Sequence, residues 1–311
     1  DKGMNVDHRM TPALRLLVAA AFLGLAAMPA LAEDDGSGED KPKYPTTEFE
    51  EGATSASVTV GDVTATVTME RRPEIDKEFD TPVLHVLVGG QPAIEVPGVV
   101  SGMEFPAADA SIAPMDPGNS LPEVYFSSYS GGAHCCSHVA VAEQVGDQWV
   151  KVDVGDFDGD GNYLDDLDGD GNAEISTVDN RFLYQFDCYA CSAAPLVIYA
   201  VRAGKVEEVT RDPRFEKAHR DWLKEMEDSI DPGDKWKSPG YLAGWVAEKA
   251  ILGEGAAAFR DLTEHWDLKT DEGEEVCTSG ADIDSCPKAQ RVVMKFPDRL
   301  KLFLQQNGYA L

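Results

Sequence analysis

The sequence has 311 residues, of which 43% are hydrophobic and 8% aromatic, enough for a sizeable packed core in one large or two modest domains. It contains 27 Lys and Arg against 56 Asp and Glu, a formal net charge of −29. A surface this acidic repels phosphate backbones and anionic lipid, which argues against nucleic-acid and membrane-surface binding and suits divalent cations or cationic partners. Six cysteines allow up to three disulfides but are too few for a miniprotein held together by disulfides.

Residues 1–32 have the pattern of a signal peptide for export. Arg9 and Arg15 form a basic start, and residues 16–27 are apolar. An A-x-A cleavage site follows at residues 30–32. The apolar stretch is shorter than the roughly 20 residues that span a bilayer. We therefore expect cleavage of the signal, a periplasmic or secreted product with no membrane insertion afterwards, and cysteines that meet an oxidising environment.

The rest of the chain divides by composition into three segments. Residues 33–55 are acidic, contain Gly, Ser and Pro and lack apolar periodicity, so we expect a disordered linker. Residues 56–211 alternate short β-type runs with turn chemistry, and residues 212–311 follow a 3.6-residue apolar period. The predicted fold class is a β-rich N-terminal domain of propeller-blade-like antiparallel sheets, followed by a smaller α-helical C-terminal module.

Turn residues and apolar spacing predict the individual elements. Hairpins are expected at the turns Gly61-Asp62, Gly89-Gly90, Gly146-Asp147 and Ala203-Gly204-Lys205. Helices are expected over residues 212–230, 241–252, 256–266 and 289–306. Pro297 lies inside the last of these and should begin a new segment or kink the helix.

Two segments of the predicted β domain resemble each other. A polar loop ends at Glu123 in one segment and at Glu174 in the other, 51 residues later. Each Glu is followed by a β-type run, a turn that contains cysteine and a hairpin with Gly at its tip. That period suits one four-stranded blade, with chance similarity as the alternative to duplication.

An acidic, glycine-rich loop is the most informative part of the sequence. Asp166, Asp168 and Asp170 occupy its positions 1, 3 and 5, Asn172 its position 7 and Glu174 its position 9. Such closely spaced carboxylates repel one another strongly unless a cation lies between them. Hard oxygen ligands on a flexible ring suit Ca²⁺ better than Zn²⁺ or Mg²⁺. We therefore predict Ca²⁺ as a cofactor, bound by these five residues.

A second acidic loop precedes the first. Asp156, Asp158 and Asp160 fit the same spacing, but position 9 is Leu164, so a separate Ca²⁺ site and a solvated acidic turn both stay open. Neither loop carries the Glu that an EF-hand requires at position 12.

The pattern D-x-D-G-D-G-x-x-E, followed by an apolar strand, resembles the calcium loop of FG-GAP or VCBS-type repeats. These repeats occur in integrin-like β-propellers and in many secreted bacterial proteins. The resemblance covers roughly residues 113–210 and is specific in the loop. It implies a calcium-stabilised β structure with an interaction role, and it leaves the ligand, a protein or a glycan, unnamed.

Four central cysteines form two clusters within the predicted β domain. Cys135 and Cys136 are adjacent, and Cys188 and Cys191 form a C-x-x-C. A disulfide that closes a long loop constrains the unfolded chain more than a vicinal ring does. We therefore predict that each cysteine of the first cluster is bonded to one of the second.

Two other interpretations of these clusters remain open. His134 and His138 flank the adjacent cysteines, so copper or zinc could bind through histidines and thiolates, and the C-x-x-C could be redox-active. Cys277 and Cys286 flank a polar loop, and we expect a local disulfide between them.

The sequence nominates no catalytic centre. It contains neither a G-x-S-x-G elbow nor an H-E-x-x-H motif. The leading hypothesis is an exported, calcium-binding, disulfide-stabilised protein that binds a ligand or interacts with the cell envelope, rather than an enzyme. The alternatives are a periplasmic copper- or zinc-binding or thiol-redox protein that uses the H-C-C-S-H and C-Y-A-C clusters, and a hydrolase with an unrecognised site.

Overall fold

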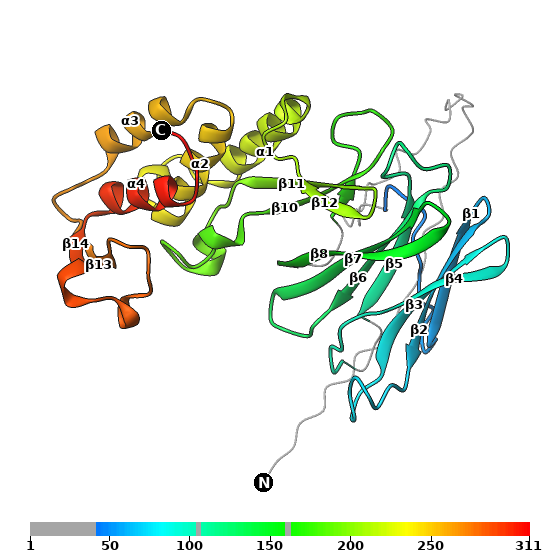
Figure 1. Cartoon of the computed structure of the whole chain (residues 1–311). Coiled ribbons are helices and arrows are strands. Elements are labelled where there is room, and N and C mark those ends of the chain that lie inside the picture. Colours follow the sequence, from blue (N-terminus) through cyan, green and yellow to red (C-terminus); the bar gives the residue numbers. More distant parts are fainter. Residues whose placement is uncertain (1–41, 104–106, 159–162) are drawn as a thin grey trace, which may run out of the picture. The chain divides into compact units, whose positions relative to one another are not determined.

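Short antiparallel strands make up the N-terminal part of the structure. The computed structural model describes residues 42–103, 107–158 and 163–311, so the predicted signal peptide and residues 33–41 of the predicted linker lie outside the described residues. In chain order the strands of this part are β1 (Ser55–Val60), β2 (Val63–Glu70), β3 (Thr81–Val88), β4 (Gln91–Pro97), β5 (Ala108–Ala113), β6 (Glu123–Tyr129), β7 (Cys135–Val145), β8 (Gln148–Asp158), β9 (Leu164–Asp165), β10 (Glu174–Val178), β11 (Leu196–Arg202) and β12 (Lys205–Glu208). Within the described ranges they form three four-stranded sheets, β1–β4, β5–β8 and β9–β12, in which neighbours in sequence are neighbours in the sheet (Figure 1).

The second sheet shares a core with each of the other two. Successive residues of a strand point to opposite faces of its sheet. Val124 and Phe126 of β6 pack into a core shared with the first sheet, and Tyr125 packs into a core shared with the third. All three side chains are almost completely buried, so this middle strand is apolar on both faces.

The four predicted hairpins are present. β1 and β2, β3 and β4, β7 and β8, and β11 and β12 are antiparallel neighbours joined at the expected turns. Gly146 and Gly204 have φ angles of 62° and 77°, which L side chains rarely adopt. The predicted fold class, a β-rich N-terminal part followed by a helical C-terminal part, is confirmed. The described strands close into neither a barrel nor a propeller.

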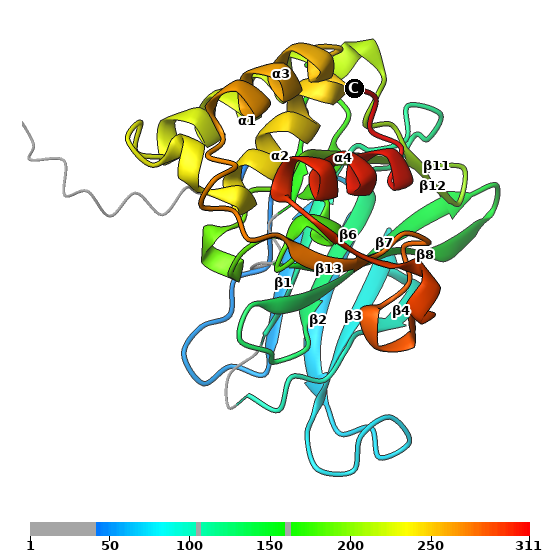
Figure 2. The ribbon, with the colours of Figure 1, turned by 90° about the vertical axis from the view of Figure 1, so that its left-hand side faces the viewer.

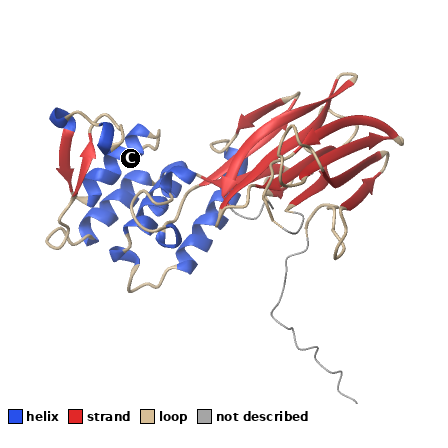
Figure 3. Cartoon of the chain, turned by 90° about the horizontal axis from the view of Figure 1, so that it is seen from below, coloured by secondary structure: helices blue, strands red, loops and turns tan. Residues whose placement is uncertain are grey.

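Helices follow the third sheet (Figure 3). The α-helices are α1 (Glu216–Ser229), α2 (Pro239–Ile251), α3 (Gly255–His265) and α4 (Phe296–Gln306). Short 3₁₀ turns are η1 (Asn180–Phe182), η2 (Tyr189–Cys191), η3 (Pro213–Phe215), η4 (Lys235–Lys237), η5 (Ile283–Ser285) and η6 (Lys288–Gln290), and a hairpin of β13 (Glu274–Cys277) and β14 (Arg291–Met294) precedes α4 (Figure 2). The residues from Pro42 to Leu311 form one compact unit, so the sheets and helices are described together.

The helix predicted over residues 289–306 is wrong in its first part. β14 pairs antiparallel with β13, and α4 begins only at Phe296. Pro297 lies in the first turn of α4. Proline is tolerated there but breaks a helix interior, so the segment begins anew at this point, one of the two outcomes expected from the sequence.

Residues 42–54 belong to the fold, although their composition predicted a linker. Thr46 forms an isolated β-bridge with Ser111, and the Thr47 N–H donates to the Ala110 carbonyl oxygen (2.9 Å). Tyr44 packs against the core between the second and third sheets. The linker predicted over residues 33–55 therefore ends earlier than expected, because backbone pairing with β5 orders a segment of polar composition.

Helix α2 lies close to the chain segment that precedes β11. A Cβ atom at Gly240 would lie 2.6 Å from the Cys191 carbonyl oxygen, and a Cβ at Gly244 would overlap the Ala193 carbonyl group. The Ala193 N–H donates to the Gly240 carbonyl oxygen (3.2 Å). Two glycines about one helical turn apart thus allow the two backbones to touch.

A buried pair of titratable side chains joins the helices to the third sheet. His219 of α1 and Glu248 of α2 are 2% and 0% exposed, and His219 Nδ1 lies 2.7 Å from Glu248 Oε1. His219 Nε2 donates to the Thr210 carbonyl oxygen (2.7 Å). Glu248 Oε2 accepts the Leu196 N–H of β11 (2.9 Å). Each nitrogen and oxygen of the pair has a partner, as buried polar groups require.

We predict that His219→Ala lowers the free energy of unfolding by about 3–5 kcal/mol, because it leaves the Glu248 carboxyl group buried without its partner. Lys217→Ala serves as the control on the same helix. It breaks an exposed ion pair with Asp221 and should change stability little. Urea unfolding followed by far-UV circular dichroism measures both variants, and losses of equal size would contradict the importance of the buried pair.

Candidate functional site

Three carboxylates converge in the acidic loop between β9 and β10 (residues 166–174). Asp166, Asp168 and Glu174 each offer one carboxylate oxygen, and these oxygens all lie within 4.8 Å of one another. Glu174 is 2% exposed, and the Asp168 side chain is 5% exposed. A converging set of carboxylate oxygens is the kind of group that holds Ca²⁺.

Backbone N–H groups hold these carboxylates in place. Asp166 accepts from the N–H groups of Gly169 (2.8 Å) and Gly171 (3.2 Å), and Glu174 accepts from that of Leu167 (3.0 Å). The two glycines have φ angles of 78° and 93°. Because residues other than glycine rarely adopt such backbone angles, the glycines let the loop curl around its carboxylates.

A guanidinium group balances part of the negative charge. Arg214 of η3 donates from Nη1 to Asp168 Oδ2 (2.8 Å) and lies 3.8 Å from Asp170 Oδ2. Loop spacing did not predict Arg214 at this site, because it is 46 positions away from Asp168 in the sequence. Its only local signal was the Asp212-Pro213 start of the helical part, where the Asp212 side chain accepts the Arg214 N–H (3.0 Å).

Burial and repulsion between carboxylates shift two pKa values at the loop. Burial, followed by the charges of the loop's aspartates, raises the pKa of Glu174 to about 7. Burial, followed by the charges of Asp166, Asp165 and Glu174, raises the pKa of Tyr44 to about 12. A cation beside the carboxylates would favour their ionised forms.

The other two predicted calcium ligands, Asp170 and Asn172, are hydrogen-bonded to each other. Asp170 Oδ1 accepts from the backbone N–H (2.8 Å) and the side-chain amide (3.0 Å) of Asn172. The two side chains are therefore bonded to each other. The structure brings together Asp166, Asp168 and Glu174, and calcium binding by the full set stays a prediction.

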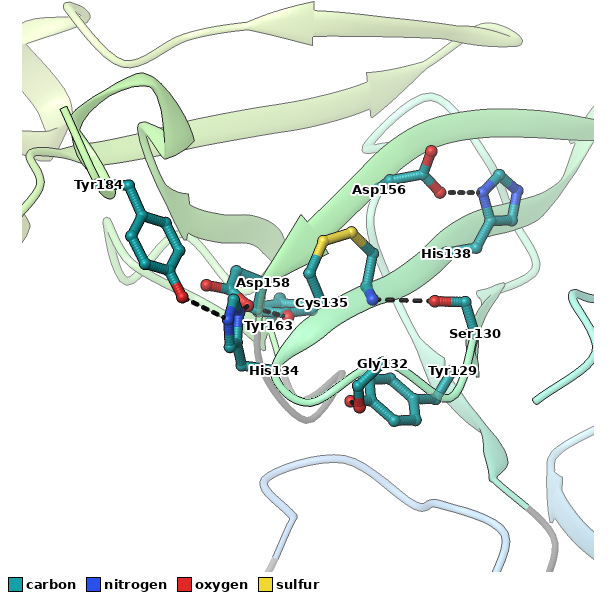
Figure 4. Close-up of a disulfide and its surroundings, with 11 residues drawn as sticks. Tyr129, Ser130, Gly132, His134, Cys135, His138, Asp156, Asp158, Tyr163 and Tyr184 are labelled. Atoms are coloured by element: carbon teal, nitrogen blue, oxygen red, sulfur yellow. Dashed lines mark hydrogen bonds and ion pairs between the residues drawn. A yellow bond between two sulfur atoms is a disulfide. The ribbon is translucent and has the colours of Figure 1, made fainter. Parts of the chain in front are cut away.

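The earlier acidic loop has a different arrangement. Asp156 and Asp158 lie at the end of β8, and Asp160 lies outside the described residues. His138 Nδ1 lies 2.8 Å from Asp156 Oδ1, and His134 Nδ1 lies 3.2 Å from Asp158 Oδ1 (Figure 4). The two described carboxylates thus have histidine partners, and a second Ca²⁺ site stays a prediction.

His134 forms a cluster with two tyrosines from the segment after β10, Tyr184 and Tyr189. Its ring stacks on that of Tyr189, with centroids 3.9 Å apart, and its Nε2 lies 3.0 Å from the Tyr184 hydroxyl (Figure 4). Burial, followed by a hydrogen bond with Asp158, raises the pKa of Tyr189 to about 12. Tyr184 is 61% exposed, so this aromatic group reaches the surface.

The predicted pairing of the four central cysteines is wrong. Cys135 is bonded to Cys136, and Cys188 is bonded to Cys191. The turn η2 brings the Cα atoms of Cys188 and Cys191 to 5.0 Å, within the ordinary range for a disulfide. The prediction rested only on the entropy of the loops that the disulfides would close. It was wrong because the turn η2 brings Cys188 and Cys191 together locally.

The third predicted disulfide, Cys277–Cys286, is confirmed. No free cysteine is left among the described residues. Nδ1 and Nε2 of both His134 and His138 have hydrogen-bonding partners. Over the described ranges, the structure therefore does not bring these histidines together with thiolates as a copper or zinc site.

The loop before β6 occupies the same place in the second sheet as the acidic loop does in the third. Glu123 begins β6 as Glu174 begins β10, and it is 1% exposed. Its carboxylate accepts the Met115 N–H (2.6 Å) and the Asn119 side-chain amide (2.8 Å). An amide group thus lies beside this glutamate, where aspartates surround Glu174. The 51-residue spacing was the sequence signal for the correspondence.

A third buried glutamate lies beside the loop before β6. Glu143 of β7 is 0% exposed and accepts the Gly204 N–H (2.7 Å). Burial raises the pKa of Glu143 to about 7, and a hydrogen bond with the Asp116 carboxyl group adds to the shift. The pKa of Asp116 is lowered, with the hydrogen bond from Glu143 among the causes, so Glu143 binds a proton more readily than Asp116 does.

Together these features define a disulfide-bonded, β-rich protein with a helical C-terminal domain. Residues 219–308 match the family described as the sll0997 C-terminal domain. The chain is 34% identical over 259 residues to the "Probable thylakoid lumen protein sll0997" of Synechocystis sp., across 82% of this chain and 76% of that protein. The chain therefore belongs to the sll0997 family.

A second relative is the "Uncharacterized protein y4bJ" of Sinorhizobium fredii. It is 32% identical over 204 residues, which are 65% of this chain and 32% of that protein. The present chain thus corresponds to about a third of that relative. No solved structure matches the chain. Among the described residues, no helix has the length and apolar character needed to cross a membrane.

The raised pKa of Glu143 predicts a pH dependence of stability. Its pKa is about 7 in the folded protein and 4.5 ordinarily, so between these values the folded state binds more protons than the unfolded state. The free energy of unfolding should therefore fall as the pH rises from about 4.5 to about 7. Glu143→Gln should reduce this slope, because glutamine does not titrate.

Urea unfolding at a series of pH values measures the slope. The difference between wild type and variant is the informative quantity, because the pKa of Glu174 lies in the same range. Glu207→Gln, at an exposed position of β12, is the control and should leave the slope unchanged. An unaltered slope in Glu143→Gln would show that this residue is not the titrating group.

Proposed function

We propose that this chain is an exported, calcium-binding protein that is stabilised by disulfides and binds a protein or glycan ligand. The family relative from Synechocystis is named as a probable thylakoid lumen protein. That lumen is comparable to the periplasm, which supports export of this chain to a similar compartment. Disulfides such as Cys277–Cys286 persist in oxidising compartments of this kind.

The convergence of Asp166, Asp168 and Glu174 carries the calcium proposal. Three carboxylates within 4.8 Å of one another, two of them largely buried, supply hard oxygen donors and strong mutual repulsion. Among the described residues, Arg214 is the guanidinium group that forms an ion pair with these three carboxylates, and it contacts only Asp168. Ca²⁺ would supply the remaining positive charge and favour the ionised form of Glu174.

The position of the loop supports the resemblance to FG-GAP or VCBS-type repeats. The acidic loop connects β9 to β10 within a four-stranded antiparallel sheet, and an apolar strand follows it directly. Under this proposal the ion fixes the loop and the edge of the third sheet. The sheets then present a rigid surface to the ligand.

Calcium should raise the melting temperature, because the ion binds only the folded loop. Ca²⁺ at about 100 times its Kd adds about 2.7 kcal/mol of stability, which corresponds to a shift of several degrees for a protein of this size. EDTA should remove the shift. Differential scanning calorimetry at pH 7.5 measures it.

Two variants locate the ion. Asp168→Ala should abolish the response to Ca²⁺, because it removes one of the three converging carboxylates. Arg214→Gln is the matched control, since it removes the other partner of Asp168 and leaves the carboxylates, and it should keep the response. If Asp168→Ala gained as much stability from Ca²⁺ as wild type, the ion would bind elsewhere.

A further inference from the structure

Two disulfides each close a very short loop, and the side chain of Tyr189 links the segments that carry them. Cys135–Cys136 lies at the start of β7, and Cys188–Cys191 closes the turn η2 between β10 and β11. The sequence separations within the pairs are 1 and 3. The calcium proposal assigns no role to either pair.

Tyr189, between the two cysteines of the second pair, makes the contacts that join the clusters. Its ring stacks on His134, the residue before Cys135, with centroids 3.9 Å apart. Its hydroxyl is hydrogen-bonded to Asp158. Asp158 is the residue that pairs with Cys135 across β7 and β8. Two contacts of the Tyr189 side chain thus join the turn η2 to residues beside the vicinal disulfide.

Glycines pack closely against the backbone of a cysteine in each of the two clusters. A Cβ at Gly240 of α2 would lie 2.6 Å from the Cys191 carbonyl oxygen. A Cβ at Gly132 would overlap the Cys135 carbonyl oxygen. The Cys136 N–H donates to the Ser130 hydroxyl oxygen (2.9 Å; Figure 4). These contacts fix the backbone at both disulfides independently of their sulfur bonds.

Stabilisation does not account for the two pairs. The stability that a disulfide adds by restricting the unfolded chain grows with the loop it closes, so these pairs add the least that a disulfide can. Cys277–Cys286 closes a longer loop, and its cysteines are 6% and 4% exposed. Cys188 and Cys191 are exposed, so an external thiolate can reach them.

We propose that the four central cysteines carry out thiol–disulfide exchange with a dithiol protein. A thiolate of the partner attacks a sulfur of Cys188–Cys191, forming a mixed disulfide and releasing one cysteine as a thiol. The second thiol of the partner resolves the mixed disulfide, so the partner leaves as a disulfide and Cys188 and Cys191 are both thiols.

The second step transfers the two electrons within the chain. A thiolate of Cys188 or Cys191 attacks Cys135–Cys136 and forms a disulfide between the clusters. The remaining thiolate of the Cys188 and Cys191 pair then attacks its neighbour's sulfur and breaks that disulfide. Cys188–Cys191 is formed again, and Cys135 and Cys136 become thiols. Overall, the partner dithiol loses two electrons and two protons, and the Cys135–Cys136 disulfide gains them.

The test uses the oxidised full-length protein and reduced thioredoxin as the dithiol probe. Samples are quenched with N-ethylmaleimide at intervals, and labelled cysteines are identified by peptide mass mapping. In wild type, label should appear at all four central cysteines while Cys277 and Cys286 stay unlabelled. In Cys188→Ser/Cys191→Ser, labelling of Cys135 and Cys136 should be at least about tenfold slower, because thioredoxin must then attack the less exposed disulfide directly.

Cys277→Ser/Cys286→Ser is the matched control and should label the central cysteines at the wild-type rate. Labelling of Cys135 and Cys136 at that same rate in Cys188→Ser/Cys191→Ser would overturn the internal transfer. Absence of label from all four central cysteines in wild type would overturn the exchange activity itself. Neither result bears on the response to Ca²⁺, so the calcium proposal is tested separately.

A single variant traps the intermediate and does not depend on the folding of the double variant. Cys191→Ser leaves the Cys188 thiol beside an intact Cys135–Cys136 disulfide. Non-reducing peptide mapping should then find Cys188 bonded to Cys135 or Cys136, with the other cysteine labelled by maleimide. A Cys188 that is fully labelled, next to an unbroken Cys135–Cys136 disulfide, would overturn the transfer between clusters.

Discussion

The buried pair of His219 and Glu248 is the contact on which the arrangement of the helices and the third sheet depends. It joins α1 to α2 and, through the Leu196 N–H, fixes both to β11. The acidic loop precedes β10 and the turn η2 precedes β11, so both candidate sites are built on the sheet that this pair anchors. A polar contact between helices thereby helps to position the sheet that carries the acidic loop.

Much of the fold follows from local sequence signals. The hairpins form where Gly and Asp mark two-residue turns between alternating apolar runs, and α1 to α3 form where apolar residues recur with the helical period. β14 was not predictable in this way, because its residues become a strand only by pairing with β13, and Cys277 opposes Arg291 from 14 residues earlier. Non-local pairing likewise orders Thr46 against Ser111, despite the polar composition around it.

For the candidate sites too, contacts within a short loop could be predicted from the sequence, whereas contacts that depend on the fold could not. Spacing within the acidic loop placed Asp166, Asp168 and Glu174 together, because the glycines between them force the loop to curl. It did not show that Asp170 bonds to Asn172 instead, which depends on rotamers. For the cysteines, the sequence predicted bonds between the two clusters, and the structure has one bond within each cluster. The bonding was wrong, because loop entropy says nothing about which sulfur atoms a turn brings together.

Because the second and third sheets correspond, the loop before β6 can be compared directly with the acidic loop before β10. At the start of β6, Glu123 is buried beside the side-chain amide of Asn119, and the pKa of nearby Glu143 is raised to about 7. At the start of β10, Glu174 is buried among aspartates. A buried glutamate thus stands at the same position in both sheets, and its charge is accommodated by different neighbours in each. If the sheets arose from one ancestral unit, the two copies now differ in the groups that surround this buried carboxylate, an amide beside Glu123 and aspartates beside Glu174.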